Sequence, residues 1–81
     1  MPIDRFTMTE WVVEALEELG GRGTILDVSK TLWKNHGSEI RESDEIFYKW
    51  QYEMRWAGDI LRKEGVLEPA DRSSKGLWIL A

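Results

Sequence analysis

Cysteine is absent from the 81 residues, which excludes disulfide bonds, thiolate metal sites and cysteine nucleophiles. The single histidine, His36, leaves too few ligands for a histidine-based metal site and no conventional catalytic triad. No apolar run approaches about 18 residues, and no basic-then-apolar stretch begins the chain, so neither a membrane span nor a signal peptide is predicted. We therefore expect a cytoplasmic protein that is not an enzyme and holds no metal or other cofactor.

The composition is that of a folded globular chain. Hydrophobic residues make up 42% of the sequence and charged residues 32%, with only 7 glycines and 2 prolines. Five tryptophans are many for such a short chain and indicate a packed interior rather than disorder. At this length we expect residues 1–81 to form one domain around one small core.

The formal net charge of −4 is unevenly distributed. The first 20 residues carry five acidic side chains and one basic side chain, whereas the other 61 carry ten of each sign. An acidic chain disfavours a polyanionic ligand in general. Here the excess belongs to one N-terminal element, so the question becomes which faces of the fold carry which charges.

Two capping boxes mark the first two helices. Thr7 and Glu10 fit the first box and predict a helix over 8–19, ended by Gly20-Gly21. Thr24 and Asp27 fit the second box and predict a shorter helix over 26–35.

The end of this second helix is placed at Asn35-His36-Gly37, with a polar loop over 37–43. In that interpretation His36 caps the C-terminal end of the helix, where the helix dipole favours a positive charge.

Ser43 is predicted to cap a third, long helix over 44–64, a stretch with no proline and one glycine. Its apolar positions fall on one arc at 100° per residue and form the expected core face: Phe47, Trp50, Met54, Ala57, Gly58 and Leu61. We also expect Trp78 to lie in the core and Trp56, outside this arc, to pack beneath the C-terminal strands.

Two short apolar runs, 66–68 and 77–80, flank a polar turn and predict a β-hairpin. Gly23-Thr24 could supply a further short strand between the first two helices. The order of three helices followed by a hairpin is typical of an α+β winged helix-turn-helix domain, in which the hairpin is the wing. The alternative is any other small α+β domain with the same order of elements.

The C-terminal half resembles the winged-helix domain found at the N-terminus of Mrr-type restriction endonucleases. The matching runs are Arg55-Trp56-Ala57, Leu61-Arg62-Lys63-Glu64-Gly65-Val66-Leu67 and Gly76-Leu77-Trp78-Ile79-Leu80. Residues 8–33 match more loosely, as an amphipathic helix, a glycine stop and a second helix. The resemblance implies a DNA-binding module without a nuclease, since cleavage in that family belongs to a separate domain.

The predicted DNA-binding residues lie on the outward side of the long helix and at the tip of the hairpin. An outward helix face with forked donors can read base edges in the major groove, and basic or hydroxyl side chains at a wing tip can contact phosphates. The residues are Lys49, Gln51, Tyr52, Arg55, Arg62, Lys63, Arg72, Ser73, Ser74 and Lys75.

Two interpretations of these residues stay open. In the first, double-stranded DNA is the partner, helped by a second copy of the chain or a partner protein that raises a weak affinity. In the second, the same hairpin and the aromatic side chains bind a protein partner, and the domain binds no nucleic acid. The overall acidity favours the second interpretation, and the basic helix and hairpin tip favour the first.

Overall fold

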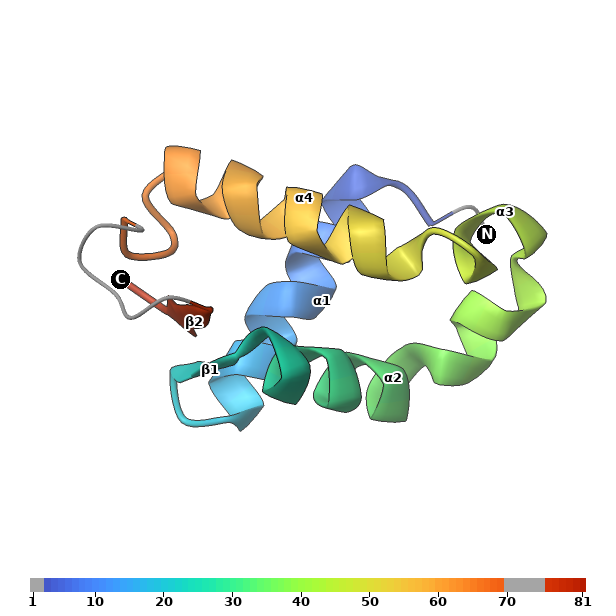
Figure 1. Cartoon of the computed structure of the whole chain (residues 1–81), viewed down its shortest axis with the longest axis horizontal. Coiled ribbons are helices and arrows are strands. Elements are labelled where there is room, and N and C mark those ends of the chain that lie inside the picture. The colour runs from blue at the N-terminus through green and yellow to red at the C-terminus, as the bar shows by residue number, and fades with distance from the viewer. Residues whose placement is uncertain (1–2, 70–75) are drawn as a thin grey trace.

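The computed structural model describes residues 3–69 and 76–81, and it is a small α+β domain of helices and a two-stranded antiparallel sheet (Figure 1). The elements in chain order are α1 (Arg5–Glu18), β1 (Arg22–Thr24), α2 (Ile25–Glu42), α3 (Asp44–Phe47), α4 (Trp50–Lys63) and β2 (Leu77–Ile79). None of the helices in these ranges is both long and apolar enough to cross a membrane.

Helix α1 begins three residues earlier than the sequence predicts. Its N-cap is Asp4, whose carboxylate accepts a hydrogen bond of 2.8 Å from the backbone N–H of Thr7. The box predicted at Thr7 is therefore wrong, because a stronger cap lies one turn upstream. The predicted stop is confirmed: Gly20 and Gly21 follow the helix at φ +87° and +101°, where a Cβ would be strained.

Helix α2 begins as predicted but continues well past its predicted end. The Thr24 hydroxyl accepts from the Asp27 N–H at 3.0 Å, and the Asp27 carboxylate accepts from the Thr24 N–H at 3.2 Å, which confirms the capping box. The helix then runs through Gly37 to Glu42, so the expected loop over 37–43 is wrong. Gly37 is buried beneath Trp33, whose ring would lie 3.1 Å from a Cβ at this position. This glycine provides close packing rather than a helix stop.

The predicted helix over 44–64 is divided into two. Ser43 makes no side-chain cap, and a turn at residues 48–49 separates α3 from α4, closed by a 3.0 Å bond from the Lys49 N–H to the Ile46 carbonyl. The turn changes the direction of the chain, so Ile46 is buried while Phe47 is 36% exposed. Phe47 is therefore not part of the core face, as an unbroken helix would require.

Strand β2 pairs with β1, with Gly23 opposite Trp78. The short strand expected at Gly23-Thr24 is thus confirmed, and the simple order of three helices followed by a hairpin is corrected, because a strand lies between α1 and α2. Segment 66–68 meets the chain around β2 through an antiparallel bridge between Leu67 and Leu80 and a 2.8 Å bond from the Glu68 N–H to the Ile79 carbonyl.

The core lies where α1, α2, α4 and the sheet meet. Its buried side chains are Met8, Trp11, Val12, Ala15, Leu16, Val28, Leu32, Ile40, Ile46, Met54, Ala57, Leu61, Leu67 and Trp78. Trp78 is buried as predicted and packs on Gly58 of α4, where an added Cβ would lie 2.5 Å from the indole. A bare backbone at Gly58 is what lets β2 approach α4 this closely.

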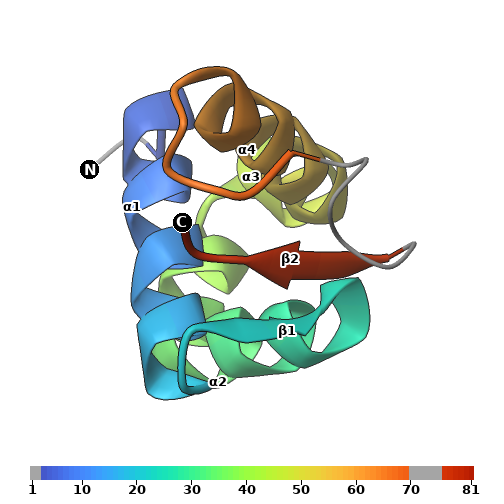
Figure 2. The same ribbon diagram turned by 90° about the vertical axis from the view of Figure 1, so that its left-hand side faces the viewer.

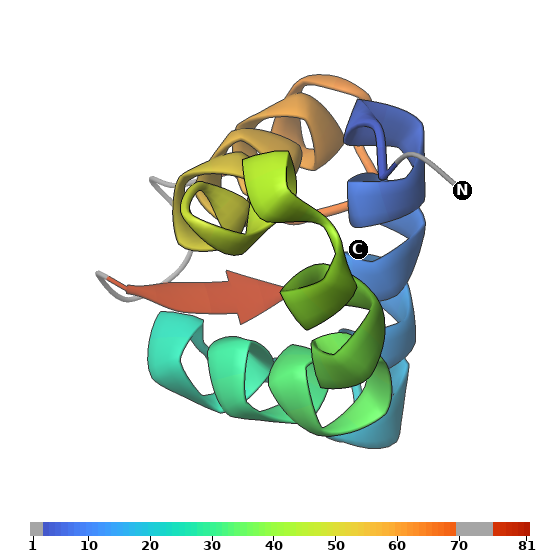
Figure 3. The same cartoon turned by 90° about the vertical axis from the view of Figure 1, so that its right-hand side faces the viewer.

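The helices form a simple arrangement in space. In Figure 1, α2 and α4 lie one below the other, α1 passes behind them, and the sheet and α3 lie at opposite ends. Figures 2 and 3 confirm from the two ends that α1 covers only one side of the α2–α4 pair. The other side of this pair is therefore not covered by α1, and we call it the open face.

Candidate nucleic-acid interface

A stripe of polar side chains on α4 lies on the open face. Gln51, Arg55, Gly58 and Arg62 are spaced by four, three and four residues, which places them on one side of a helix. Because Gly58 is covered by Trp78, this side of α4 lies beside β2. Gln51 and Arg55 are exposed, and Arg62 is partly buried, with its Nε donating no hydrogen bond within the described part of the chain.

The opposite side of α4 packs against the first turn of α1. Glu53 pairs with Arg5 at 3.4 Å, and the Arg5 guanidinium lies 5.2 Å from the centre of the Trp56 ring. Trp56 therefore contacts α1, and it is Trp78 that joins the sheet to α4. Since α1 lies on this side, the stripe of Gln51, Arg55 and Arg62 faces away from it.

The other predicted residues of the long helix do not join this stripe. Tyr52 and Lys63 lie on the adjacent side of α4, and Tyr52 meets Trp56 edge-on, with ring centres 6.5 Å apart. Lys49 lies in the turn before α4 and pairs with Glu45 at 3.7 Å. The structure thus brings together three of the six predicted helix residues and separates the rest.

The predicted tip residues Arg72, Ser73, Ser74 and Lys75 lie outside the described residues. They stay predictions.

Sequence reasoning missed a second row of cations, which lies on α2. Lys30 and Arg41 are both exposed, and they share one side of the helix with Trp33 and Gly37. Trp33 stacks against Trp50 of α4 with ring centres 5.6 Å apart, and the Arg41 guanidinium lies 5.5 Å from the Trp33 ring centre. The helical spacing of these residues would indicate the row. A helix predicted to end at residue 35 does not include Gly37 and Arg41, so the row could not be recognised.

The cations of the two rows make no ion pair within the described part of the chain, unlike three other cations. Arg5, Lys34 and Lys49 each pair with a carboxylate at 3.4–3.7 Å. Within residues 3–69 and 76–81, no ion pair forms at the four cations of the two rows, Lys30, Arg41, Arg55 and Arg62, and none forms at Arg22 and Lys63, which lie outside the rows.

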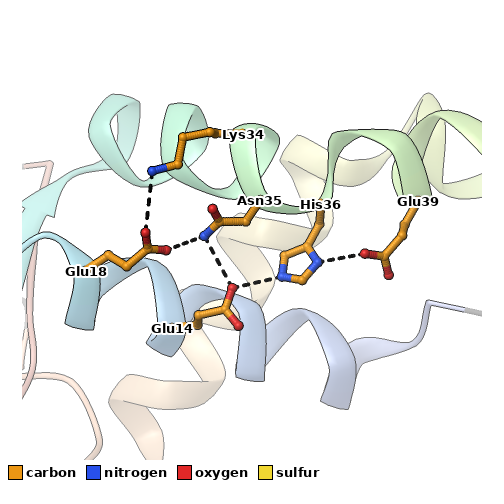
Figure 4. Close-up of polar contacts among 6 residues, drawn as sticks. All are labelled: Glu14, Glu18, Lys34, Asn35, His36 and Glu39. Atoms are coloured by element: carbon orange, nitrogen blue, oxygen red, sulfur yellow. Dashed lines mark hydrogen bonds and ion pairs between the residues drawn. The ribbon is translucent and has the colours of Figure 1, made fainter.

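The side of α2 that faces α1 carries a polar network instead (Figure 4). The His36 ring stacks on Trp11 at 3.9 Å, nearly parallel at 6°. Its Nε2 lies 2.9 Å from the Glu14 carboxylate and its Nδ1 2.9 Å from that of Glu39. His36 therefore lies within a helix and bridges to α1, and the expected role as a helix-end cap is wrong.

Burial of the imidazole lowers the pKa of His36, but its hydrogen bonds to Glu39 and Glu14 and their negative charges outweigh that effect. The net result is a pKa above the ordinary histidine value. Carboxylates only accept hydrogen bonds, so a ring that donates from both nitrogens is an imidazolium.

Neighbouring side chains complete the network. The Asn35 amide donates to Glu18 and, at 3.3 Å, to Glu14, while Lys34 reaches Glu18 at 3.4 Å. The bond from Asn35 is the main cause that lowers the pKa of the Glu18 carboxyl, with Lys34 adding to it. These carboxylates are already engaged by side chains of α2.

Neither a metal site nor a pocket of one charge sign is found in the described part of the chain. No group of three or more His, Asp or Glu side chains within 3–69 and 76–81 could hold a metal ion. A shallow pocket of about 290 Å³ lies between the start of α1 and the turn before α4. Arg5 and Lys49 line it together with Asp4, Glu45 and Glu53, so opposite charges are mixed and no single ligand charge is favoured.

No family model, curated protein or solved structure matches this chain. The resemblance to the restriction-endonuclease domain therefore stays a prediction carried by the residues quoted above.

Proposed function

We propose that this chain is a DNA-binding winged-helix domain that carries no catalytic activity. The α4 stripe of Gln51, Arg55 and Arg62 enters the major groove of double-stranded DNA, and the side chains of Arg72 and Lys75 contact the DNA backbone. Acidic α1 faces away from the duplex.

The arrangement of the elements supports this class of fold. A helix, a short strand and two further helical segments precede β2, which pairs with β1 on one side. On its other side the chain around β2 meets 66–68, with a 2.9 Å bond from the Ala81 N–H to the Val66 carbonyl in addition to the contacts of Leu67 and Glu68. In this proposal, segment 66–68 and β2 serve as the two arms of the wing.

One observation carries the proposal: Arg55 and Arg62 lie on the open face without carboxylate partners. The exposed guanidinium of Arg55 is available to phosphate oxygens, and its planar fork also matches guanine O6 and N7, whereas the Nε of Arg62 is buried. Gln51 lies on the same stripe and can pair with adenine N6 and N7. The net charge of the chain does not oppose this, because α1 separates its carboxylates from the stripe.

Titration of labelled duplex DNA tests the proposal, with amide chemical shifts followed at low and moderate salt. The variant Arg55→Gln/Arg62→Gln should bind at least about tenfold more weakly, since each arginine that contacts a base contributes about 1–3 kcal/mol. The matched control is Arg22→Gln/Lys34→Gln, which removes the same charge from exposed positions outside the two rows. Its affinity should stay close to that of the unchanged chain.

Absence of any shift at about 50 mM salt would contradict DNA binding, because electrostatic contacts are strongest at low ionic strength. Equal losses in the variant and in its control would contradict the assignment of the stripe.

A second function, protein binding, is favoured by exposed aromatic side chains. Tyr48 is 84% exposed and Tyr52 60%, and Phe47 packs edge-on against Tyr48 with ring centres 5.0 Å apart. Exposed tyrosines are enriched in protein interfaces. The variant Tyr48→Ser/Tyr52→Ser separates the two functions. If DNA binds to the open face, this variant should keep the DNA affinity of the unchanged chain. If the tyrosines form a protein-binding site, the variant should no longer bind the protein partner.

A further inference from the structure

Helix α2 presents one continuous row toward the open face. Lys30, Trp33, Gly37 and Arg41 follow each other at spacings of three, four and four residues, so their side chains leave the helix on the same side. The row holds no carboxylate, and both of its cations are exposed.

Two contacts place this row beside α4. The Ser29 hydroxyl lies 3.5 Å from the Met54 sulfur, and the Trp33 and Trp50 rings stack at 5.6 Å. On its other side, α2 meets α1 through His36. Figures 1 and 2 show that α1 lies on one side of α2 and α4. The row and the α4 stripe therefore flank the same helix–helix contact, on the side away from α1.

Arg41 is held in place without a carboxylate partner. Its guanidinium lies 5.5 Å from the centre of the Trp33 ring, and that ring is itself fixed against the bare backbone of Gly37 at 3.1 Å from a Cβ position. A cation–π contact orients a guanidinium but uses none of its N–H donors. The donors of Arg41 stay available to an oxygen acceptor of opposite charge.

We infer that Lys30 and Arg41 bind phosphates of the DNA strand that borders the groove entered by α4; this inference rests on the proposed function. The two residues are 11 positions apart, about 16 Å along the helix axis at 1.5 Å per residue. One strand of a duplex carries one phosphate per about 3.4 Å of the duplex axis, so about five phosphates of that strand lie along such a length.

The two rows then have different tasks. Contacts to phosphate add affinity without sequence information, whereas contacts to base edges add specificity. The α2 row therefore contributes a salt-dependent, sequence-independent part of the affinity. The α4 stripe contributes the part that differs between DNA sequences.

Salt-dependent DNA titration of the full chain tests this division, with two duplexes of unrelated sequence as probes. The variant Lys30→Gln/Arg41→Gln should weaken binding to both duplexes by the same factor and reduce the slope of log K against log salt by about two. Lys34→Gln is the control on the same helix, because Lys34 is paired with Glu18, and its slope should match that of the unchanged chain. Arg41→Lys keeps the charge and should keep the slope.

Thermal unfolding of each variant shows whether the fold is intact. An unchanged slope for Lys30→Gln/Arg41→Gln, while Arg55→Gln/Arg62→Gln loses binding, would overturn the inference and leave the proposed function standing. An equal loss in Lys34→Gln would overturn it as well, since net charge alone would then explain the effect. Failure of the unchanged chain to bind either duplex would overturn both proposals.

Discussion

The two sides of α2 use their charges in opposite ways. Toward α1, Lys34, Asn35 and His36 are joined to Glu14 and Glu18 in a polar network. On the open face, Lys30 and Arg41 make no ion pair within the described part of the chain. One side of α2 thus has its polar groups paired with α1, and the other side carries cations that are available to a ligand.

This difference shows why net charge is a poor guide to the partner of a small domain. The acidic excess lies on α1, and two of its glutamates, Glu14 and Glu18, are engaged by α2. Arg55 and Arg62 lie on the other side of the molecule. A ligand that approaches the open face meets Lys30, Arg41, Arg55 and Arg62, and none of these cations makes an ion pair within the described residues.

The largest expected effect concerns the apolar contact that holds α4 to β2. Gly58→Ala places a methyl group 2.5 Å from the Trp78 ring, and overpacking of this kind costs about 1–3 kcal/mol. Chemical denaturation should show this loss equally at acidic and alkaline pH, because no titratable group is involved. Asp59→Ala, on the exposed side of the same helix, is the control and should change the free energy of unfolding little. An unchanged stability of Gly58→Ala would show that Trp78 can move aside.

The next effect concerns the stability of α2, the helix that carries both the polar network and the row of cations. Thr24→Ala removes the hydroxyl of the capping box, and loss of such a cap costs about 1 kcal/mol. Denaturation should report the loss, with Ser38→Ala at an exposed interior position of the same helix as the control. A loss as large in Ser38→Ala would argue against the cap as its cause.

The side of α2 toward α1 should depend on pH. Because the pKa of His36 is raised in the folded chain, its stabilising effect is fully present below the ordinary value of about 6.5 and is lost as pH rises through the raised value. The charged groups that contact the ring are Glu14 from α1 and Glu39 from α2, and the charge of Glu18 from α1 also acts on it. Relative to His36→Gln, the unchanged chain should lose stability across this window.

An NMR pH titration checks the same point directly, since the chain has one histidine and its ring signal is unambiguous. A pKa at or below the ordinary value would contradict the bridging role of His36.

The smallest effect concerns the outer surface of α1. Glu10 and Glu17 are exposed and lie in no ion pair within residues 3–69 and 76–81. Glu10→Gln/Glu17→Gln should change the free energy of unfolding by less than about 0.5 kcal/mol per site, as expected for exposed surface residues. DNA affinity should rise by less than about threefold at low salt, because these charges are distant and screened. A larger rise would show that α1 lies near the bound DNA and would blur the distinction between the two faces.

Local signals predicted the elements whose cause is local. The capping box at Thr24 and Asp27, the stop at Gly20 and the burial of Trp78 follow from neighbouring residues and side-chain size. The predicted end of α2 near Gly37 was wrong, because glycine can end a helix or allow close packing. Only the position of Gly37 under Trp33 distinguishes these two roles. Because the predicted helix ended too early, Arg41 was not recognised as a residue on the same side of α2 as Lys30.

In the candidate site, too, some residues could be predicted from local sequence and others could not. Gln51, Arg55 and Arg62 could be predicted, since they lie on one stripe of an evident helix. Lys49 could not be assigned correctly, because its place in a turn and its pairing with Glu45 depend on the break before α4.

The sequence by itself determined that one helical domain with a C-terminal strand would form, because helix caps, apolar spacing and tryptophan content act over a few residues. Only the tertiary structure decided which charges are engaged and which are left for a ligand. Ion pairing joins residues that are distant in the chain, such as Lys34 and Glu18, and their distance in space is set by how the helices pack.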